Sequence, residues 1–198
     1  MLRAVREAPH AHDERLSRRA EYHRQQELTD ELLLCAGSGK IGGGVVSSEQ
    51  QIGNVLGRYA DYIDTGRLEM AADLFSRARI KVSGAGGDGT VDSEGVLEVW
   101  RAWMIIYPDG TPRTKHVITN AIIEVDEQAD FATSASYYTV FQQTEGFPLQ
   151  PICAGRYHDE FRREDGLWHF VFRDYSLLDL VGDLSRHGSE EVRRQLGI

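Results

Sequence analysis

Cysteine is scarce in this chain of 198 residues, which contains only Cys35 and Cys153, far apart in sequence. This scarcity disfavours both a disulfide framework and a cysteine-rich zinc site. Long apolar runs are also missing: no stretch approaches the roughly 20 residues of a membrane-spanning helix. The first residues contain no apolar core of a signal peptide. We therefore expect a soluble, cytoplasmic protein.

Basic residues are in deficit, with 22 Lys and Arg against 31 Asp and Glu and a formal net charge of −9. A nucleic-acid-binding protein normally presents a basic face, and so does a protein that binds an anionic membrane surface. Both partners are therefore disfavoured. Residues 1–46 are neutral overall, so the whole negative charge belongs to residues 47–198.

The sequence motifs of cofactor sites are absent as well. No dinucleotide-binding fingerprint follows a strand, and the GSGK sequence at 37–40 lacks the rest of a phosphate-binding loop. No Gly-x-Ser-x-Gly nucleophile elbow occurs. His158 and His169 have no ligand spacing that compels a metal site. We therefore expect neither a cofactor nor a metal.

Helical periodicity dominates the first part of the chain. A polar helix is predicted over 13–35, followed by a glycine-rich linker over 37–44. Apolar residues then recur at helical spacing from Ile52 to Ile63, after a serine cap and before Gly66. The predicted helices cover 47–66, 67–76 and 93–106, with one strand over 79–84.

After Pro112 the period changes to that of β-strands. The predicted strands cover 113–126, 131–144, 151–163 and 167–177. Helices followed by an antiparallel meander predict an α+β fold, in which a long curved sheet carries the helices on its concave side and leaves a conical pocket. We expect a helical and flexible extension over 1–46, an α+β barrel domain over 47–185 and a tail with a short helix over 186–198.

The order of elements and several local motifs resemble one family. The motifs are RYADYID (58–64), RTKHVITN (113–120), GRYHDEFRREDGLWHF (155–170) and the nearby Arg173. They resemble the SnoaL-like branch of the nuclear-transport-factor-2-like superfamily, which includes scytalone dehydratase, bile-acid 7-alpha-dehydratase and lindane dehydrochlorinase. The resemblance covers roughly 47–178. Because this fold hosts many chemistries and some proteins that are not enzymes, it implies the fold more strongly than the reaction.

The resemblance implies that Asp64 and His116 form a catalytic dyad with His116 as the base. A neutral histidine can accept a proton at neutral pH. A carboxylate on its other ring nitrogen fixes the tautomer and stabilises the imidazolium as it forms. The plain alternative is an exposed aspartate at a helix end and an ordinary strand histidine.

The resemblance extends to Tyr59, which matches a tyrosine of the bile-acid dehydratase motif, and to Arg173, which matches a basic pocket residue of the dehydrochlorinase-like relatives. Tyr59 lies five residues before Asp64, about 140° around a helix, so both can face one point only if Asp64 turns inward at the helix end. A buried tyrosine hydroxyl can donate to an oxyanion, although Tyr59 can equally be a core residue. Arg173 alternates out of phase with Trp168, so a bulge is needed to bring both inside. Its alternative role is a salt bridge to a surface carboxylate.

Five further residues are candidates for binding the substrate or for lining its pocket. Asn120 shares a predicted strand face with His116, and its alternative is to satisfy the backbone at a sheet irregularity. Ser136 and Tyr138 share a face of the next strand. Trp103 and Phe141 are core or apolar pocket wall.

Together these features predict a lyase of the dehydratase type that acts without a cofactor on a small, largely apolar, oxygenated molecule. Isomerisation and polyketide-type cyclisation use the same first proton abstraction and stay open. A ligand-binding or structural subunit without activity is the alternative from another class. A convex sheet face rich in apolar residues needs covering, so we expect a homo-oligomer, a trimer first and a dimer second.

Overall fold

The computed structural model describes residues 40–41, 44–82, 89–190 and 194. The chain divides into two compact units, residues 1–45 and 46–198. In the first unit, β1 (Lys40–Ile41) pairs antiparallel with β2 (Gly44–Val45), so two short strands lie where the sequence predicted only a flexible linker. The helix predicted over 13–35 lies outside the described residues, as does most of the helix predicted in the C-terminal tail.

The second unit begins with helices close to their predicted positions. α2 (Ser48–Asp64) is capped by Ser47, whose side chain accepts a hydrogen bond from the backbone N–H of Gln50 at 3.3 Å. Gly66 follows its end with a φ of +77°. A side chain at this position would meet the carbonyl oxygen of Gly110, so only glycine fits the turn.

Two shorter helices follow. α3 (Leu68–Asp73) is shorter than predicted, and α4 (Ser93–Trp103) is capped by Asp92, which accepts from the backbone N–H of Gly95 at 2.9 Å. Among the described residues, no helix is long and apolar enough to cross a membrane.

The sheet has seven strands within the described residues. They are β3 (Arg79–Lys81), β4 (Thr90–Val91), β5 (Thr114–Asp126), β6 (Phe131–Thr144), β7 (Phe147–Glu164), β8 (Leu167–Asp174) and β9 (Leu178–Val181). Their order is β4-β3-β8-β7-β6-β5, with β9 beside β7. β6 has its predicted bounds. β7 begins four residues earlier than predicted, because only Glu145 and Gly146 turn between the two strands.

The α+β class is confirmed, and the sheet differs from the prediction in two respects. All its pairs are antiparallel except β3 with β8, which run parallel, so the sheet is mixed. Its edge strands β4 and β5 do not pair with each other, so the sheet does not close into the predicted barrel. The sequence predicted β3 as a strand, but it contains no signal for a partner some 90 residues later.

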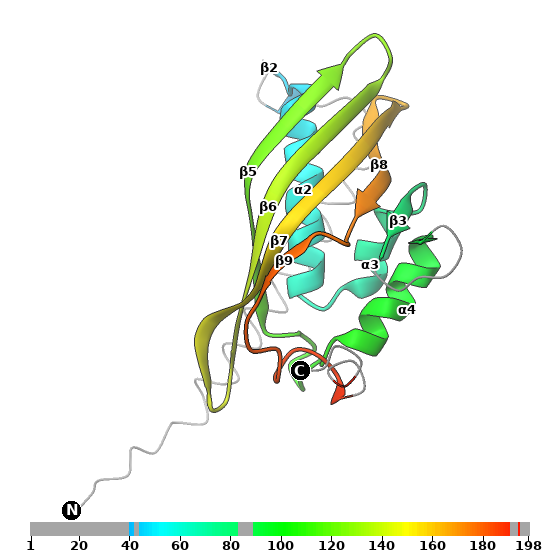
Figure 1. The fold of residues 1–198 in the computed structure, drawn as a ribbon. Coiled ribbons are helices and arrows are strands. Elements are labelled where there is room, and N and C mark those ends of the chain that lie inside the picture. The colour runs from blue at the N-terminus through cyan, green and yellow to red at the C-terminus, as the bar shows by residue number, and fades with distance from the viewer. Residues whose placement is uncertain (1–39, 42–43, 83–88, 191–193, 195–198) are drawn as a thin grey trace, which may run out of the picture. The chain divides into compact units, whose positions relative to one another are not determined.

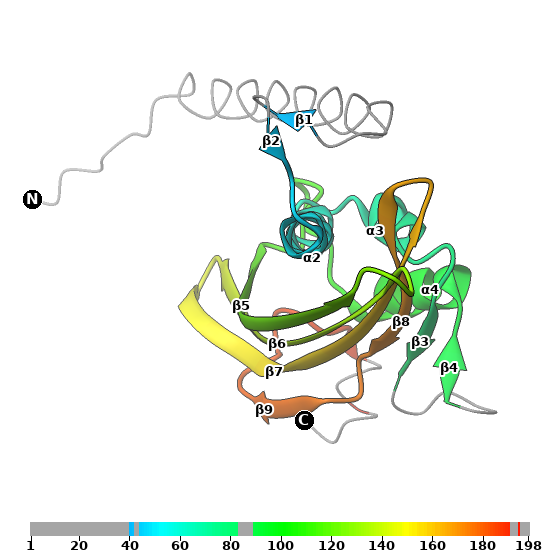
Figure 2. The same cartoon turned by 90° about the horizontal axis from the view of Figure 1, so that it is seen from above.

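α2 lies against the concave side of the curved sheet (Figures 1 and 2) and contacts both β5 and β8. Its apolar face, including Ile52, Leu56 and Ile63, joins a core with buried sheet residues such as Ile152 and Phe161. The C-terminal end of α2 therefore lies against the first residues of β5, and this contact brings Asp64 and His116 together.

Candidate functional site

Asp64 is the last residue of α2 and is only 5% exposed. Its Oδ1 atom lies 2.7 Å from Nδ1 of His116 and accepts a hydrogen bond from Thr114 Oγ1 at 2.8 Å. Its Oδ2 atom accepts from the backbone N–H of His116 at 2.7 Å. Burial opposes ionisation, but the hydrogen bonds and charge of His116 and the hydrogen bond from Thr114 outweigh it and lower the pKa of Asp64.

This geometry fixes the tautomer of His116. Because an ionised carboxylate only accepts hydrogen bonds, Nδ1 carries the proton that it shares with Asp64. In the neutral ring, Nε2 then has a free lone pair. The side chain is 8% exposed, so little water competes for that nitrogen. The pair can therefore act as a general base oriented by a carboxylate.

Tyr59 lies on the same helix as Asp64 and contacts the same histidine. The ring centroids of Tyr59 and His116 are 6.2 Å apart, with the rings close to edge-on. The 140° between Tyr59 and Asp64 is accommodated because Asp64, at the helix terminus, reaches across to β5 while Tyr59 points into the core. Burial raises the pKa of Tyr59, despite Arg173 and the hydrogen bonds from neighbouring tyrosines.

Tyr59 belongs to a tyrosine cluster, which we define as Tyr59, Tyr138, Tyr157 and Tyr175. Tyr138 stacks on Tyr157 at 4.4 Å, and Tyr157 lies 5.9 Å from Tyr59 and 5.6 Å from Tyr175. The Tyr175 hydroxyl donates to that of Tyr59. Burial raises the pKa values of all four, so their hydroxyls stay protonated and can donate hydrogen bonds.

Arg173 is fully buried, and its partner is also buried. Its Nε and Nη2 atoms donate to the two carboxylate oxygens of Asp159 at 2.6 and 2.8 Å, and both side chains are 0% exposed. The surface salt bridge offered as its alternative role is therefore wrong. Its guanidinium carbon lies 4.3 Å from the ring centroid of Tyr59 and 4.2 Å from that of Tyr157. Burial disfavours its charge, but Asp159 and the tyrosines raise the pKa of Arg173 well above its usual value.

A bulge in β8 brings Arg173 to the interior. Phe170 pairs with Phe161 and Phe172 pairs with Glu160, so Val171 has no counterpart on β7. The extra residue shifts the alternation by one position. Trp168, Phe170 and Arg173 are consequently all buried, at 4%, 0% and 0% exposure.

The candidate substrate-binding residues do not all lie on the same face of the sheet. Ser136 and Tyr138 share the buried face of β6, as expected, and within the described ranges the enclosed Oγ of Ser136 has no hydrogen-bond partner. Phe141 lies on the other face of that strand and Trp103 is half-buried at the end of α4.

Asn120 does not share the face of His116. It is exposed, with a φ of +54°, at a bulge between Thr119 and Ile122 that breaks the strand alternation. This is the sheet irregularity that was its alternative interpretation.

One residue near the dyad was missed. His187 interacts electrostatically with both His116 and Asp64, and its enclosed Nδ1 atom has no hydrogen-bond partner in the part of the chain that the structure describes. Burial, reinforced by His116, lowers its pKa to about 4. The sequence contained no signal for this role, because His187 lies in the predicted tail and in no motif.

A groove of about 440 Å³ runs between α2 and β5 and reaches the dyad. Gly57, Ala60 and Asp61 line it from the helix, and Lys115 and Ile118 line it from the strand, beside Asp64 and His116. Within the described ranges, no group of three or more His, Cys, Asp or Glu residues could hold a metal ion.

These features define a class of protein, an α+β fold with a buried histidine–aspartate pair inside a curved sheet. Residues 45–174 match the family model of the SnoaL-like domain, and the chain belongs to that family. No curated protein matches the sequence. Membership supports either an enzyme that needs no cofactor or a ligand-binding subunit.

Solved structures share the fold at low identity, and the three described next are from Novosphingobium aromaticivorans. An NTF2-like protein with a cystatin-like fold is 22% identical, with 86% of this chain and 96% of that chain covered and a TM-score of 0.52. A proposed scytalone dehydratase is 21% identical over 68% and 86%, with a TM-score of 0.51. The beta subunit of a proposed aromatic-ring-hydroxylating dioxygenase is 22% identical over 69% and 93%, also at 0.51.

Proposed function

We propose that the protein is a lyase of the dehydratase type that acts on a small, largely apolar, oxygenated molecule without a cofactor. The observation that carries this proposal is the 2.7 Å contact between His116 Nδ1 and Asp64 Oδ1 in a buried setting. A histidine held in this way serves as a base for a carbon-bound proton next to a carbonyl or aromatic group.

The proposed first step is the transfer of that proton to Nε2 of His116. Asp64 stabilises the imidazolium as it forms, because an ionised carboxylate lies on Nδ1. The electron pair left on carbon moves into the activating group, whose oxygen gains negative charge, and Tyr59 is the proposed donor to this oxygen. In an elimination, the pair then forms the new double bond and expels a hydroxyl group, which leaves as water with the proton from His116.

Arg173 contributes to this site through its neighbours. With two of its nitrogens bound to Asp159, it is better placed to act on the tyrosine cluster than on the substrate. Its positive charge, 4.3 Å from the ring centroid of Tyr59, favours negative charge near that hydroxyl. We propose Arg173 as a positioning residue, and Ser136, Tyr138 and Trp103 as candidates to contact the substrate.

The second candidate function is a subunit without activity, and the similarity to a dioxygenase beta subunit favours it. Isomerisation or cyclisation would use the same base and differ only in where the electron pair moves. The experiment must therefore test for the base itself, before any natural substrate is known.

The probe is 5-nitrobenzisoxazole, in which a base removes the ring C–H proton while the nitrogen–oxygen bond breaks to give a coloured phenolate. We expect measurable turnover by the full chain and a loss of about 100-fold or more in His116→Ala. His158→Ala, a change at an exposed histidine of β7, is the matched control and should keep the full rate. Equal rates for the wild type and His116→Ala would contradict the proposal. A screen of metabolites for water loss would then identify the substrate.

A further inference from the structure

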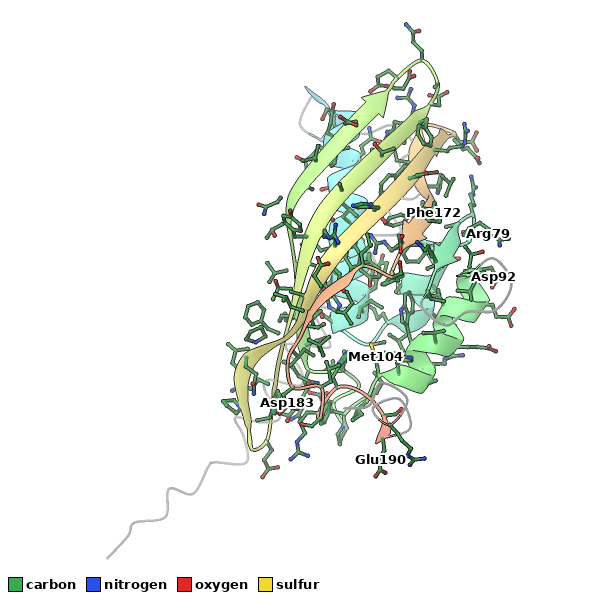
Figure 3. All side chains as sticks on the ribbon, viewed as in Figure 1. Arg79, Asp92, Met104, Phe172, Asp183 and Glu190 are labelled. Atoms are coloured by element: carbon green, nitrogen blue, oxygen red, sulfur yellow. The ribbon has the colours of Figure 1, made fainter. Side chains whose placement is uncertain are left out.

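His187 lies in a segment, residues 184–189, that follows β9 and falls outside the residues matched to the SnoaL-like domain. Met104, at the end of α4, and Asp183 and Glu190, which flank this segment, lie toward the same end of the molecule (Figure 3). A β-bridge between Met104 and Gly188 joins the two chain segments.

The backbone of the segment is held firmly on the α4 side. The N–H of Ile105 donates to the carbonyl oxygen of His187 at 2.9 Å. The N–H of Ser189 donates to the carbonyl oxygen of Trp103 at 2.8 Å. These hydrogen bonds, at residues 187 and 189, hold the stretch of backbone that carries the His187 side chain.

A second anchor, on β6, ties the segment to the start of β5, the strand that carries His116. Gln142 is fully buried, and its Nε2 donates to the carbonyl oxygens of Arg186 at 2.9 Å and Pro112 at 3.0 Å. Gln142 pairs in register with Thr114, which itself donates to Asp64. The segment is therefore held at the start of β5, two residues before His116.

The ring of His187 has unused hydrogen-bonding capacity at this place. Its Nδ1 atom is enclosed and has no hydrogen-bond partner among the described residues, which is rare for a buried polar atom and calls for a reason. The other charged or titratable groups that act on it are His116 and Asp64. An unpaired imidazole nitrogen next to the dyad is suited to bind a ligand there.

We propose that His187 binds a hydroxyl group of the ligand beside His116. A neutral imidazole donates from one ring nitrogen and accepts at the other, and a hydroxyl group can complement either tautomer. With a pKa of about 4, the ring carries no extra proton to give at neutral pH, so His187 holds the hydroxyl and is not its acid. The proposal rests on the proposed function, since the hydroxyl would be the group that leaves.

The test compares phenol and toluene, which have similar shape while only phenol carries a hydroxyl group. In the full chain with isotope-labelled histidines, we expect phenol to shift the ring signals of both His116 and His187. Toluene should shift the His187 signal by only a small fraction of the shift that phenol causes. The chain has seven histidines, and the signal that is missing from the spectrum of His187→Gln is assigned to His187.

Variants separate binding from folding. His187→Phe should weaken phenol binding about tenfold without weakening toluene binding, while His187→Gln, which keeps hydrogen-bonding atoms, should stay within about threefold of the wild type. His158→Phe is the control at an exposed position. If His187→Phe does not fold, the wild-type shifts alone decide.

The outcomes also distinguish this inference from the proposed function. A phenol shift at His116 with none at His187, or no shift at either ring, overturns the inference. A phenol shift at His187 in a protein that does not turn over 5-nitrobenzisoxazole supports the hydroxyl site and contradicts the lyase.

Discussion

Nδ1 of His116 lies 2.7 Å from Oδ1 of Asp64, and the same carboxylate accepts the backbone N–H of His116 through its other oxygen. The aspartate therefore holds both the ring and the backbone of one residue. This arrangement joins the end of α2 to the start of β5, so the contact that orients the base also fixes the helix on the sheet.

Asp64→Asn should lower the rate of 5-nitrobenzisoxazole turnover by about 10²–10⁴-fold. The amide can present its N–H group to Nδ1, which favours the tautomer with the proton on Nε2, and it cannot stabilise the imidazolium. Initial rates at neutral pH measure the effect, and circular dichroism checks the fold. Asp61→Asn, on the same helix and beside the same groove, is the control. Equal losses in both variants would speak against an orienting role for Asp64.

The second prediction concerns the pH dependence of stability through His187. Its pKa falls from 6.5 in the unfolded chain to about 4 in the folded protein, chiefly because of burial. The unfolded chain thus binds more protons between these values, so stability is full above pH 6.5 and is lost as the pH falls toward 4. The contribution at stake is about 3 kcal/mol.

Urea denaturation of the wild type and His187→Gln from pH 7.5 to 4 measures this contribution as a difference, in which the other titrating groups cancel. The free energy of unfolding of the wild type should fall relative to the variant across the window. A difference that stays constant with pH would show that the folded protein does not hold His187 neutral.

The third prediction concerns the buried ion pair of Arg173 and Asp159. Arg173→Met leaves a buried carboxylate without a partner and should destabilise the protein by about 3–5 kcal/mol. Adding Asp159→Leu should restore part of the loss, because no buried charge then remains. Arg156→Met is the matched control: it breaks a pair with Asp179 of similar geometry but about 40% exposed, and should have little effect on stability. If the loss of stability in the double variant equals the sum of the losses in Arg173→Met and Asp159→Leu, the two residues are not coupled and the prediction is contradicted.

Much of the fold was predictable because its signals are local. Periodicity gave α2, α4 and the long strands, since each buries one face along its whole length. The strands that were missed are β1, β2, β4 and β9, which span only two to four residues each, too few to show a period. The parallel pairing of β3 with β8 depends on three-dimensional proximity alone, which the sequence pattern does not encode.

The site was predictable only where a motif carried it. The family motifs gave Asp64, His116 and Tyr59 together, although helical geometry alone argued against two of them meeting. Two bulges determine the orientation of the other candidate residues. The bulge at Val171 turns Arg173 toward the interior, and the bulge after Thr119 turns Asn120 toward the surface. His187 could not be found, because its position depends on backbone hydrogen bonds to α4 and on Gln142.

The last prediction is oligomerisation through the face of the sheet opposite the core. Val117 and Leu180 lie in one cross-strand row from β5 to β9 and are 42% and 69% exposed; Tyr137, two residues before the row on β6, is 53% exposed. Apolar side chains gathered on one face favour burial against another copy. Light scattering on the eluting protein should give the mass of a trimer, three times the chain mass of 22.3 kDa. The second expectation is the mass of a dimer.

Charges placed on this face should separate the copies, because each would be buried without a partner. We expect Tyr137→Glu combined with Leu180→Glu to elute as a monomer with an unchanged circular dichroism spectrum. Leu149→Glu, at a 66% exposed position of β7 outside the row, is the control and should leave the assembly intact. A wild-type protein that elutes as a monomer would rule out this assembly and leave the apolar face to another partner.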